Sequence, residues 1–259
     1  MSIKESLSLT GKRGLLVGIA NSHSIAWGCA QALYEMGAEL AVTWLNDKAR
    51  VHVEPLAQQV QASVCMPLDV TRAGELEALF ERIAEQWGSL DFVVHCLASA
   101  PKGEIRGRLL DSSTTGFQQA MDISCHSFIR MARLAEPLMS RGGSLVTMSY
   151  LGAQEVIDGY ALMGPVKAAL ESSVRYLATE LGPRNIRVHA ISPGPMPTRA
   201  ASGLKNFDHL LEASADRAPL RRLVTLEEVG ALCVWLVSNA SQGQTGGIHF
   251  IDGGLNTLG

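Results

Sequence analysis

The sequence lacks the patterns of a metal centre, a disulfide framework or a membrane protein. Its 5 cysteines include no C-x-x-C pair, and the odd count, with several in apolar runs, indicates buried free thiols in a reducing compartment. The 7 histidines form no H-E-x-x-H motif and no cluster with cysteine, so no metal site is expected. No run approaches the roughly 20 apolar residues of a membrane span, and residues 1–11 have no apolar core like that of a secretion signal. These absences predict a cytoplasmic protein with no membrane partner.

An excess of one charge is also missing. The chain has 22 Lys and Arg against 25 Asp and Glu, for a net charge of −3, so no electrostatic attraction draws it to nucleic acid or to an anionic membrane. What it has in quantity is hydrophobic residues, 47% of the total, and 25 glycines. A chain of 259 residues with this composition can bury one sizeable core, and we predict a single domain over residues 1–259.

Short apolar runs alternate with longer segments of helical periodicity along the whole chain. The runs expected as strands are residues 13–19, 38–44, 63–68, 91–97, 144–148, 186–191 and 247–251. The segments expected as helices are residues 24–36, 48–60, 73–87, 115–139 (one long helix or a broken pair), 162–181 and 225–237. This alternation, with strands apolar enough for burial on both faces, predicts an α/β fold with a Rossmann-like doubly wound parallel sheet.

The least regular stretch is residues 192–208, which contain Pro193, Pro195 and Pro197. It is longer than an ordinary connection between elements, and we expect it to be a functional loop.

A turn suited to a dinucleotide pyrophosphate follows the first expected strand. Gly18 ends that strand, and Ser24 and Ile25 open the next helix. Pyrophosphate binding requires backbone N–H groups at a helix N-terminus and a loop without bulk, and Ser24 can both cap the helix and offer its hydroxyl to phosphate. Ala20 stands where G-x-G-x-x-G has its second glycine, so an ordinary strand–helix turn with a serine cap is the alternative.

Two later segments agree with dinucleotide binding. Asp69 and Val70 follow the third expected strand, where an acidic side chain could hydrogen-bond adenine; Asp69 or Thr71 could equally cap the next helix. Leu97 follows the fourth strand in a run of small residues, which would let a cofactor cross the strand ends.

Tyr160 and Lys167 are the candidates for chemistry. They are separated by close to two helical turns and can share a face, unless Tyr160 lies on the loop that enters the helix. A phenol can hydrogen-bond a developing oxyanion, a nearby ammonium favours the phenolate, and the lysine can also hold ribose hydroxyls. Alternatively Tyr160 is a half-buried packing residue and Lys167 a solvated one. A second tyrosine, Tyr150, and the dinucleotide turn favour the functional interpretation.

On these residues the chain resembles a short-chain dehydrogenase/reductase and, within that superfamily, the bacterial enoyl-[acyl-carrier-protein] reductases of type II fatty acid synthesis. Most members of the superfamily use a Tyr-(three)-Lys spacing with an upstream serine, so the Tyr-(six)-Lys spacing here, with Tyr150 near the place of that serine, is fairly specific. The resemblance covers nearly the whole chain and rests on the turn of residues 18–26, residues 149–152, Tyr160 to Lys167, residues 194–203 and the Asp252-Gly253-Gly254 end.

The resemblance implies that reduced nicotinamide delivers hydride to the β-carbon of a trans-2-enoyl thioester carried by acyl-carrier protein. Tyr160 would stabilise the enolate, Lys167 would anchor the nicotinamide ribose, and Tyr150 would shape the acyl pocket or assist. Ala100 would contact substrate through its backbone, and Met163 would line the pocket, with ordinary core packing as the alternative. The family is usually a homotetramer.

The resemblance also implies the cofactor contacts, and the loop beyond them would order over the substrate as a lid. The residues implied are Gly18, Ser24, Ile25, Leu45, Asp69, Val70, Leu97, Lys167, Met196, Pro197, Thr198, Arg199 and Ala200. Leu45 stands where the family commonly has glutamine, and Pro197 where it often has arginine.

The cofactor is expected to be NADH, with NADPH left open because Lys48 and Arg50 could approach a 2′-phosphate; a solvated helix start also explains them. Two other functions fit the same residues. One is a carbonyl reductase of the superfamily acting on a 3-ketoacyl thioester, since Ser149 leaves a hydroxyl near the site. The other is a dinucleotide-binding protein without catalytic activity.

Overall fold

The computed structural model describes residues 2–105, 107–198 and 207–258, and within these ranges it contains one seven-stranded sheet. Every pair of neighbouring strands is parallel, in the order β3-β2-β1-β4-β5-β6-β7. The strands are β1 (Arg13–Val17), β2 (Glu39–Trp44), β3 (Val64–Pro67), β4 (Phe92–His95), β5 (Gly143–Met148), β6 (Ile186–Pro193) and β7 (Ile248–Ile251). Each matches a run expected from the sequence.

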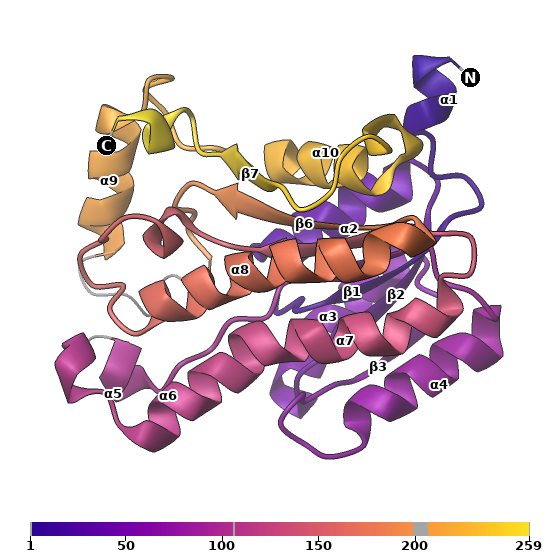
Figure 1. The fold of residues 1–259 in the computed structure, drawn as a ribbon, viewed down its shortest axis with the longest axis horizontal. Coiled ribbons are helices and arrows are strands. Elements are labelled where there is room, and N and C mark those ends of the chain that lie inside the picture. The colour runs from indigo at the N-terminus through magenta and orange to yellow at the C-terminus, as the bar shows by residue number, and fades with distance from the viewer. Residues whose placement is uncertain (1, 106, 199–206, 259) are drawn as a thin grey trace.

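Helices cover both faces of the sheet, with α4, α7 and α8 on one side and α2, α3 and α10 on the other (Figure 1). The predicted Rossmann-like doubly wound fold is therefore confirmed. The helices are α1 (Ile3–Leu7), α2 (Ile25–Glu35), α3 (Asp47–Gln59), α4 (Glu75–Trp87), α5 (Lys102–Ile105), α6 (Thr114–Met121), α7 (Ser127–Ala135), α8 (Met163–Leu181), α9 (Phe207–Arg217) and α10 (Leu226–Val237).

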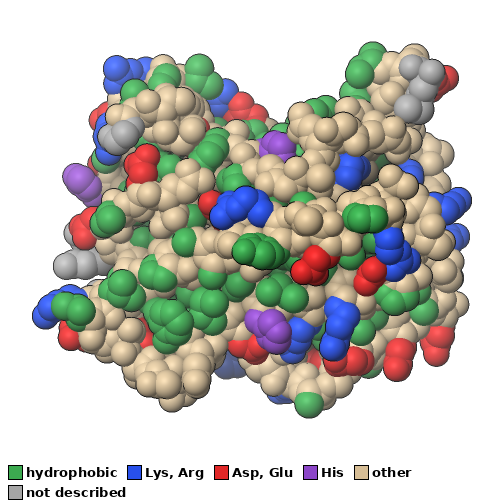
Figure 2. All heavy atoms as spheres, in the orientation of Figure 1, with side chains coloured by type: hydrophobic (Ala, Val, Ile, Leu, Met, Phe, Trp, Pro, Cys, Tyr) green, Lys and Arg blue, Asp and Glu red, His purple; other side chains and the backbone are tan. Residues whose placement is uncertain are grey.

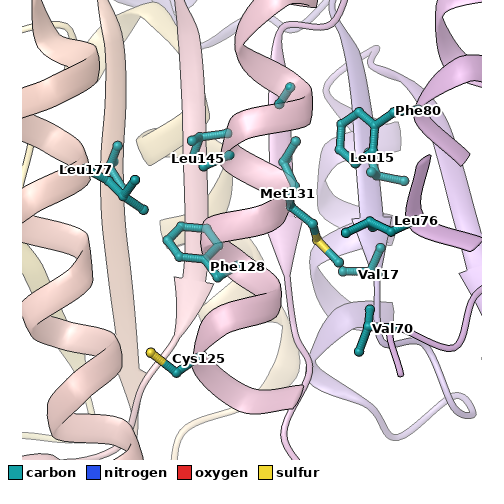
Figure 3. Close-up of a cluster of buried hydrophobic side chains, with 14 of the residues drawn as sticks. Leu15, Val17, Val70, Leu76, Phe80, Cys125, Phe128, Met131, Leu145 and Leu177 are labelled. Atoms are coloured by element: carbon teal, nitrogen blue, oxygen red, sulfur yellow. The ribbon is translucent and has the colours of Figure 1, made fainter. Parts of the chain in front are cut away.

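The core consists of one apolar layer on each face of the sheet. Leu15 and Val17 of β1 point into the layer under α4, α7 and α8, whereas Leu16 between them points into the opposite layer. Figure 3 shows Phe128 and Met131 of α7 in the first of these layers. Burial on both faces explains why the strands are continuously apolar rather than alternating.

Helix α2 packs directly on α10 through two glycines. A Cβ on Gly28 would lie 2.8 Å from both Cβ and O of Leu226, and a Cβ on Gly230 would lie 2.7 Å from the carbonyl oxygen of Gly28. This close approach is between two helices, and it holds α2 and its N-terminal turn against the body of the fold.

Three helices, α1, α5 and α9, have no counterpart in the elements expected from the sequence. The expected helix at residues 115–139 is a broken one, in which a π-helical turn, Asp122–His126, joins α6 to α7. Thr225 caps α10 in a capping box with Glu228. Of the expected loop at residues 192–208, residues 194–198 follow β6 without regular structure, residues 199–206 lie outside the described ranges, and α9 starts at Phe207.

The 5 cysteines, all in described ranges, are free thiols. No helix in the described part of the chain is long and apolar enough to cross a membrane.

Candidate active site

A cavity of about 220 Å³ opens at the carboxyl edge of the sheet, beside the switch point between β1 and β4. Ligands of doubly wound folds bind at this position, because strand order reverses there and the loops diverge. Its walls come from the segments after β1, β4, β5 and β6 and from the start of α8 and α9. It brings together these predicted residues: Gly18, Ser24, Ile25, Leu97, Ala100, Tyr150, Tyr160, Met163, Lys167, Met196 and Thr198.

Four predicted cofactor residues, Leu45, Asp69, Val70 and Pro197, are not among the described residues that line this cavity. Leu45 follows β2 with its side chain 56% exposed. Two further predicted residues, Arg199 and Ala200, lie outside the described ranges.

Asp69 and Val70 are held by local contacts. Asp69 accepts hydrogen bonds from the backbone N–H (3.0 Å) and the hydroxyl (2.6 Å) of Thr71, which closes a turn. The alternative that Asp69 or Thr71 caps the next helix is wrong, because the N-cap of α4 is Gly74. The side chain of Val70 is buried in the core, and its carbonyl oxygen accepts a hydrogen bond from Arg130 at 2.9 Å.

The turn after β1 is shaped for a pyrophosphate. Gly18 has a φ of +103°, and a Cβ there would lie 2.3 Å from the carbonyl oxygen of Cys96, so no larger residue fits this conformation. The backbone N–H groups of Ile25 and Ala26, in the first turn of α2, form no hydrogen bond with any residue that the structure describes, and both residues line the cavity. Unpaired amides at a helix N-terminus are the donors that phosphate oxygens require.

Ser24 occupies the N-cap position of α2, but its side chain does not cap the helix. The hydroxyl donates to the carbonyl oxygen of Asn21 and accepts from the backbone N–H groups of Ala20 (3.2 Å) and Asn21 (3.4 Å). The Ser24 side chain thus makes hydrogen bonds within the turn instead of capping the helix. The first backbone amides of α2 therefore stay free to bind a phosphate group.

Tyr160 lies on the loop that enters α8, three residues before the helix begins, and its carbonyl oxygen accepts from the N–H of Met163 at 2.9 Å. Pro165 falls in the first turn of α8, where proline is tolerated. The side chain of Lys167 is buried, and its Nζ donates to the carbonyl oxygen of Met148 at 2.6 Å. The alternative of a solvated lysine is therefore wrong.

The two tyrosines of the site are in contact. The ring centroids of Tyr150 and Tyr160 lie 4.8 Å apart, edge to face at 62°. Gly152 makes room for this pair, because a Cβ there would lie 2.5 Å from Cδ1 of Tyr160. Met163 serves both of its expected roles, since it is buried in the core and also lines the cavity.

Burial dominates the electrostatics of the site. Loss of solvation, and then the neighbouring Tyr150, raise the pKa of Tyr160 well above its ordinary value, and burial raises the pKa of Tyr150 to about 12. Burial lowers the pKa of Lys167 to about 8. Desolvation is the largest cause of the raised pKa of Tyr160, because burial disfavours the charged phenolate. Tyr160 is a protonated phenol, and so a hydrogen-bond donor.

Two polar features of the site were not expected from the sequence. Glu171, one helical turn after Lys167, is buried and accepts hydrogen bonds from the hydroxyl of Ser149 (2.6 Å) and the amide of Gln154 (3.0 Å). The spacing of four residues from Lys167 was the available signal, but acidic residues at such spacing mostly lie on solvated helix faces.

The second feature is a tie between the π-helical turn and the cavity wall. The hydroxyl of Ser124, fully buried, accepts from the backbone N–H of Ser99 (2.9 Å) and donates to its carbonyl oxygen (3.2 Å). Ser99 and the adjacent Ala100 line the cavity. No sequence pattern announces a π-helical turn, although such turns are frequent at functional sites.

Comparison with known proteins agrees with this geometry. The family model described as "Enoyl-(Acyl carrier protein) reductase" matches residues 18–256. "Enoyl-[acyl-carrier-protein] reductase [NADH] 1" of Rhizobium meliloti (strain 1021) is 48% identical over 251 residues, which cover 97% of this chain and 92% of that protein.

Solved structures of the same kind superpose closely. An enoyl-(acyl-carrier-protein) reductase from Anaplasma phagocytophilum, in complex with NAD, has a TM-score of 0.93 and 45% identity and covers 97% of this chain and 96% of its own. The enoyl-acyl carrier protein reductase of Bacillus cereus, with NADP⁺ and an indole naphthyridinone, has a TM-score of 0.94 and 42% identity, with coverage of 97% and 98%.

The fold, with unpaired amides at its switch point and with a phenol and a buried lysine that line the same cavity, defines a Rossmann-like dinucleotide-dependent oxidoreductase. Within that class, the chain belongs to the enoyl-(acyl carrier protein) reductase family.

Proposed function

We propose that this chain reduces the trans-2 double bond of an enoyl thioester of acyl-carrier protein in fatty acid elongation, with NADH as the electron donor. The observation that carries the proposal is that a protonated Tyr160 and the buried Lys167 line one cavity, whose amides suit a pyrophosphate. When bound, reduced nicotinamide supplies the hydride for the β-carbon.

The side chains divide the remaining tasks. The hydroxyl of Tyr160 donates a hydrogen bond to the thioester carbonyl, and this bond strengthens as negative charge develops on the oxygen of the enolate. A phenol with a raised pKa suits this role, because it keeps its proton as the charge forms. Tyr150, in edge contact with Tyr160, fixes its ring and shapes the acyl pocket. Lys167 holds the nicotinamide ribose.

The residues after β2 favour a dinucleotide without a 2′-phosphate. Arg50, one of the two basic residues near the end of β2, binds Glu54 through its Nε at 2.7 Å and stacks over the ring of Trp44 at 5.5 Å. Its guanidinium therefore has partners other than a phosphate. Together with the exposed, uncharged Leu45 after β2, this favours NADH over NADPH, and the Rhizobium meliloti relative is named as an NADH enzyme.

The apolar part of the cavity lining suits an acyl chain. Ile105, Met163, Phe207 and Leu210 supply apolar side chains there, and Ala100 offers backbone groups to the thioester. We assign the six cofactor residues without a place in the described cavity, Leu45, Asp69, Val70, Pro197, Arg199 and Ala200, to the adenosine end and the loop by family resemblance.

We also infer a homotetramer in the cytoplasm. Hydrophobic side chains gather on the surface over α5, α6 and the adjoining part of α8 (Figure 2). Among the exposed large hydrophobic residues, Leu110 between α5 and α6 is 82% exposed and Tyr176 of α8 is 72% exposed. Exposed apolar patches of this kind support self-association, and five free thiols support a reducing compartment.

The test is consumption of NADH by the purified protein with crotonyl and longer enoyl thioesters, on acyl-carrier protein and on coenzyme A, with NADPH in parallel. We expect turnover with NADH and an enoyl substrate. Turnover of a 3-ketoacyl thioester alone would identify a carbonyl reductase instead. The structure disfavours that alternative, because the hydroxyl of Ser149 is committed to Glu171. Tight NADH binding without turnover of any thioester would contradict both.

A further inference from the structure

A buried carboxylate lies next to the proposed reductase site without a role in the scheme above. Glu171 is on α8, four residues after Lys167 and on the same face of the helix. Its side chain is only 4% exposed. A carboxylate this deep is costly unless hydrogen bonds and an opposite charge compensate it, so its surroundings indicate what it does.

The hydrogen bonds of Glu171 all lead to the segment that carries Tyr150. Its Oε1 accepts from the hydroxyl of Ser149 at 2.6 Å, and its Oε2 accepts from the side-chain amide of Gln154 at 3.0 Å. The Nζ of Lys167 donates to the carbonyl oxygen of Met148 at 2.6 Å. Helix α8 thus holds residues 148–154 at three points, with Tyr150 between them.

This attachment extends to Tyr160. The ring of Tyr150 packs against that of Tyr160 with centroids 4.8 Å apart, and Gly152 leaves space for the Tyr160 ring. A shift of residues 149–154 would therefore move both phenols. Loss of either anchor changes where the donor hydroxyl points, and misplacement by about 1 Å can cost about a hundredfold in rate.

The positive charge on the same face of α8 as Glu171 is the ammonium of Lys167. Burial lowers the pKa of Lys167 to about 8, whereas Cys96 after β4, Cys125 in the π-helical turn and, to the smallest extent, the carboxylate of Glu171 raise it. His95 of β4 also faces the lysine and is neutral, because burial and the lysine lower the pKa of His95 to about 3. Glu171 is the acidic side chain among these groups.

We propose that Glu171 is a positioning residue of this reductase, which anchors the Ser149–Tyr150 segment on α8 and keeps the ammonium of Lys167 charged. The proposal rests on the proposed function for its catalytic consequence. Its effect on Lys167 also bears on NADH binding, since a charged lysine is the better donor to ribose hydroxyls, and binding is measured without turnover.

Two variants distinguish the anchoring role of Glu171 from its effect on the charge of Lys167. Glu171→Gln keeps the shape and most hydrogen-bonding capacity but removes the charge, whereas Ser149→Ala keeps the charge but removes the anchor to Tyr150. The matched control is Glu180→Gln, which changes an exposed glutamate on the same helix. The full-length protein is assayed from pH 6 to 10 for kcat, for KM of crotonyl thioester, and for the NADH dissociation constant by protein fluorescence.

Lys167 is charged below its pKa and loses its charge as pH rises through it. We expect Glu171→Gln to move the high-pH midpoint of kcat/KM and of NADH binding to lower pH, because the carboxylate favours the charged lysine. Ser149→Ala should lower kcat about tenfold with the midpoint in place, because a lost anchor disturbs orientation and not charge. Glu180→Gln should match the wild-type protein in every measurement.

An unshifted midpoint in Glu171→Gln, together with a wild-type kcat in Ser149→Ala, would overturn the proposal. If thermal unfolding shows that Glu171→Gln does not fold, Glu171→Asp is used instead, because it keeps the negative charge on a shorter side chain. For Glu171→Asp we expect the high-pH midpoint of the wild-type protein and a lowered kcat. If the wild-type protein turns over no enoyl thioester, the proposed function fails alone, and the pH dependence of NADH binding still decides the role of Glu171.

Discussion

At the scale of single residues, the proposed reaction depends on the hydroxyl of Tyr160. Tyr160→Phe keeps the ring that packs on Tyr150 but removes the donor to the thioester oxygen. We expect kcat to fall by about 10²–10³, the usual cost of one oxyanion donor, with the NADH dissociation constant unchanged. Tyr150→Phe is the matched control and should cost less, because its hydroxyl does not stabilise the enolate. An equal fall in kcat in the two variants would contradict the assignment of Tyr160 as the donor.

Gly18 is a second residue whose identity is fixed by the backbone. Its φ of +103° disfavours any L side chain, and an added Cβ would meet the carbonyl oxygen of Cys96 at 2.3 Å. We expect Gly18→Ala to lower the free energy of unfolding by about 1–3 kcal/mol and to weaken NADH binding at least tenfold, measured by urea unfolding and fluorescence titration. Gly182→Ala, where a Cβ meets nothing within 4 Å, should leave both unchanged.

At the scale of elements, the π-helical turn between α6 and α7 places the cavity wall. Ser124→Ala removes both hydrogen bonds to Ser99 and frees the segment that includes Ala100. We expect KM for the enoyl thioester to rise about fivefold, the equivalent of about 1 kcal/mol for a buried hydrogen bond, with NADH binding kept. Thr179→Ala, which removes a hydroxyl bonded only to a carbonyl oxygen of its own helix α8, is the control. A rise in KM shared by both variants would mean a general loss of packing.

The regular elements were predictable because their signals are local. The seven strands are short, apolar on both faces and bounded by turns, and Thr225 with Glu228 marks the start of α10 in four residues. Tyr160 and Lys167 were found by their spacing. Glu171 and Ser124 were missed because their importance comes from partners 22 and 25 residues away in the chain, Ser149 and Ser99, and no local pattern encodes such contacts.

At the scale of the whole molecule, the site is anchored to both layers of the core. The phosphate turn is fixed from one side, where Gly28 and Gly230 bring α2 and α10 together. Tyr160 and Lys167, the proposed catalytic pair, are held from the other side, where α8 packs against the sheet. Cofactor and substrate therefore meet at an edge that neither layer forms alone, and partial unfolding of either layer should abolish activity.

The same two-sided burial encloses two histidines. His95 of β4 is fully buried, with Nδ1 2.8 Å from the hydroxyl of Thr147 and Nε2 2.8 Å from that of Ser127. His189 of β6 is also fully buried, with Nδ1 3.1 Å from Nε2 of His249. Burial, with nearby positive charge, lowers the pKa of each to about 3. Both therefore stay neutral in the folded protein at pH values where a free histidine is protonated.

This neutrality predicts acid destabilisation that begins close to neutral pH. Below the ordinary histidine pKa of about 6.5 the unfolded chain binds protons at both positions while the folded protein does not, so the free energy of unfolding falls as pH falls, approaching about 1.4 kcal/mol per pH unit for each histidine. Urea unfolding between pH 7.5 and 5 measures this slope above the range where most carboxylates titrate. His189→Asn should reduce this slope by the amount that corresponds to about one proton. This expectation holds whether or not the substitution changes the free energy of unfolding at pH 7.5. A slope equal to that of the wild-type protein would show that His189 is protonated in the fold, and that its burial does not govern its charge.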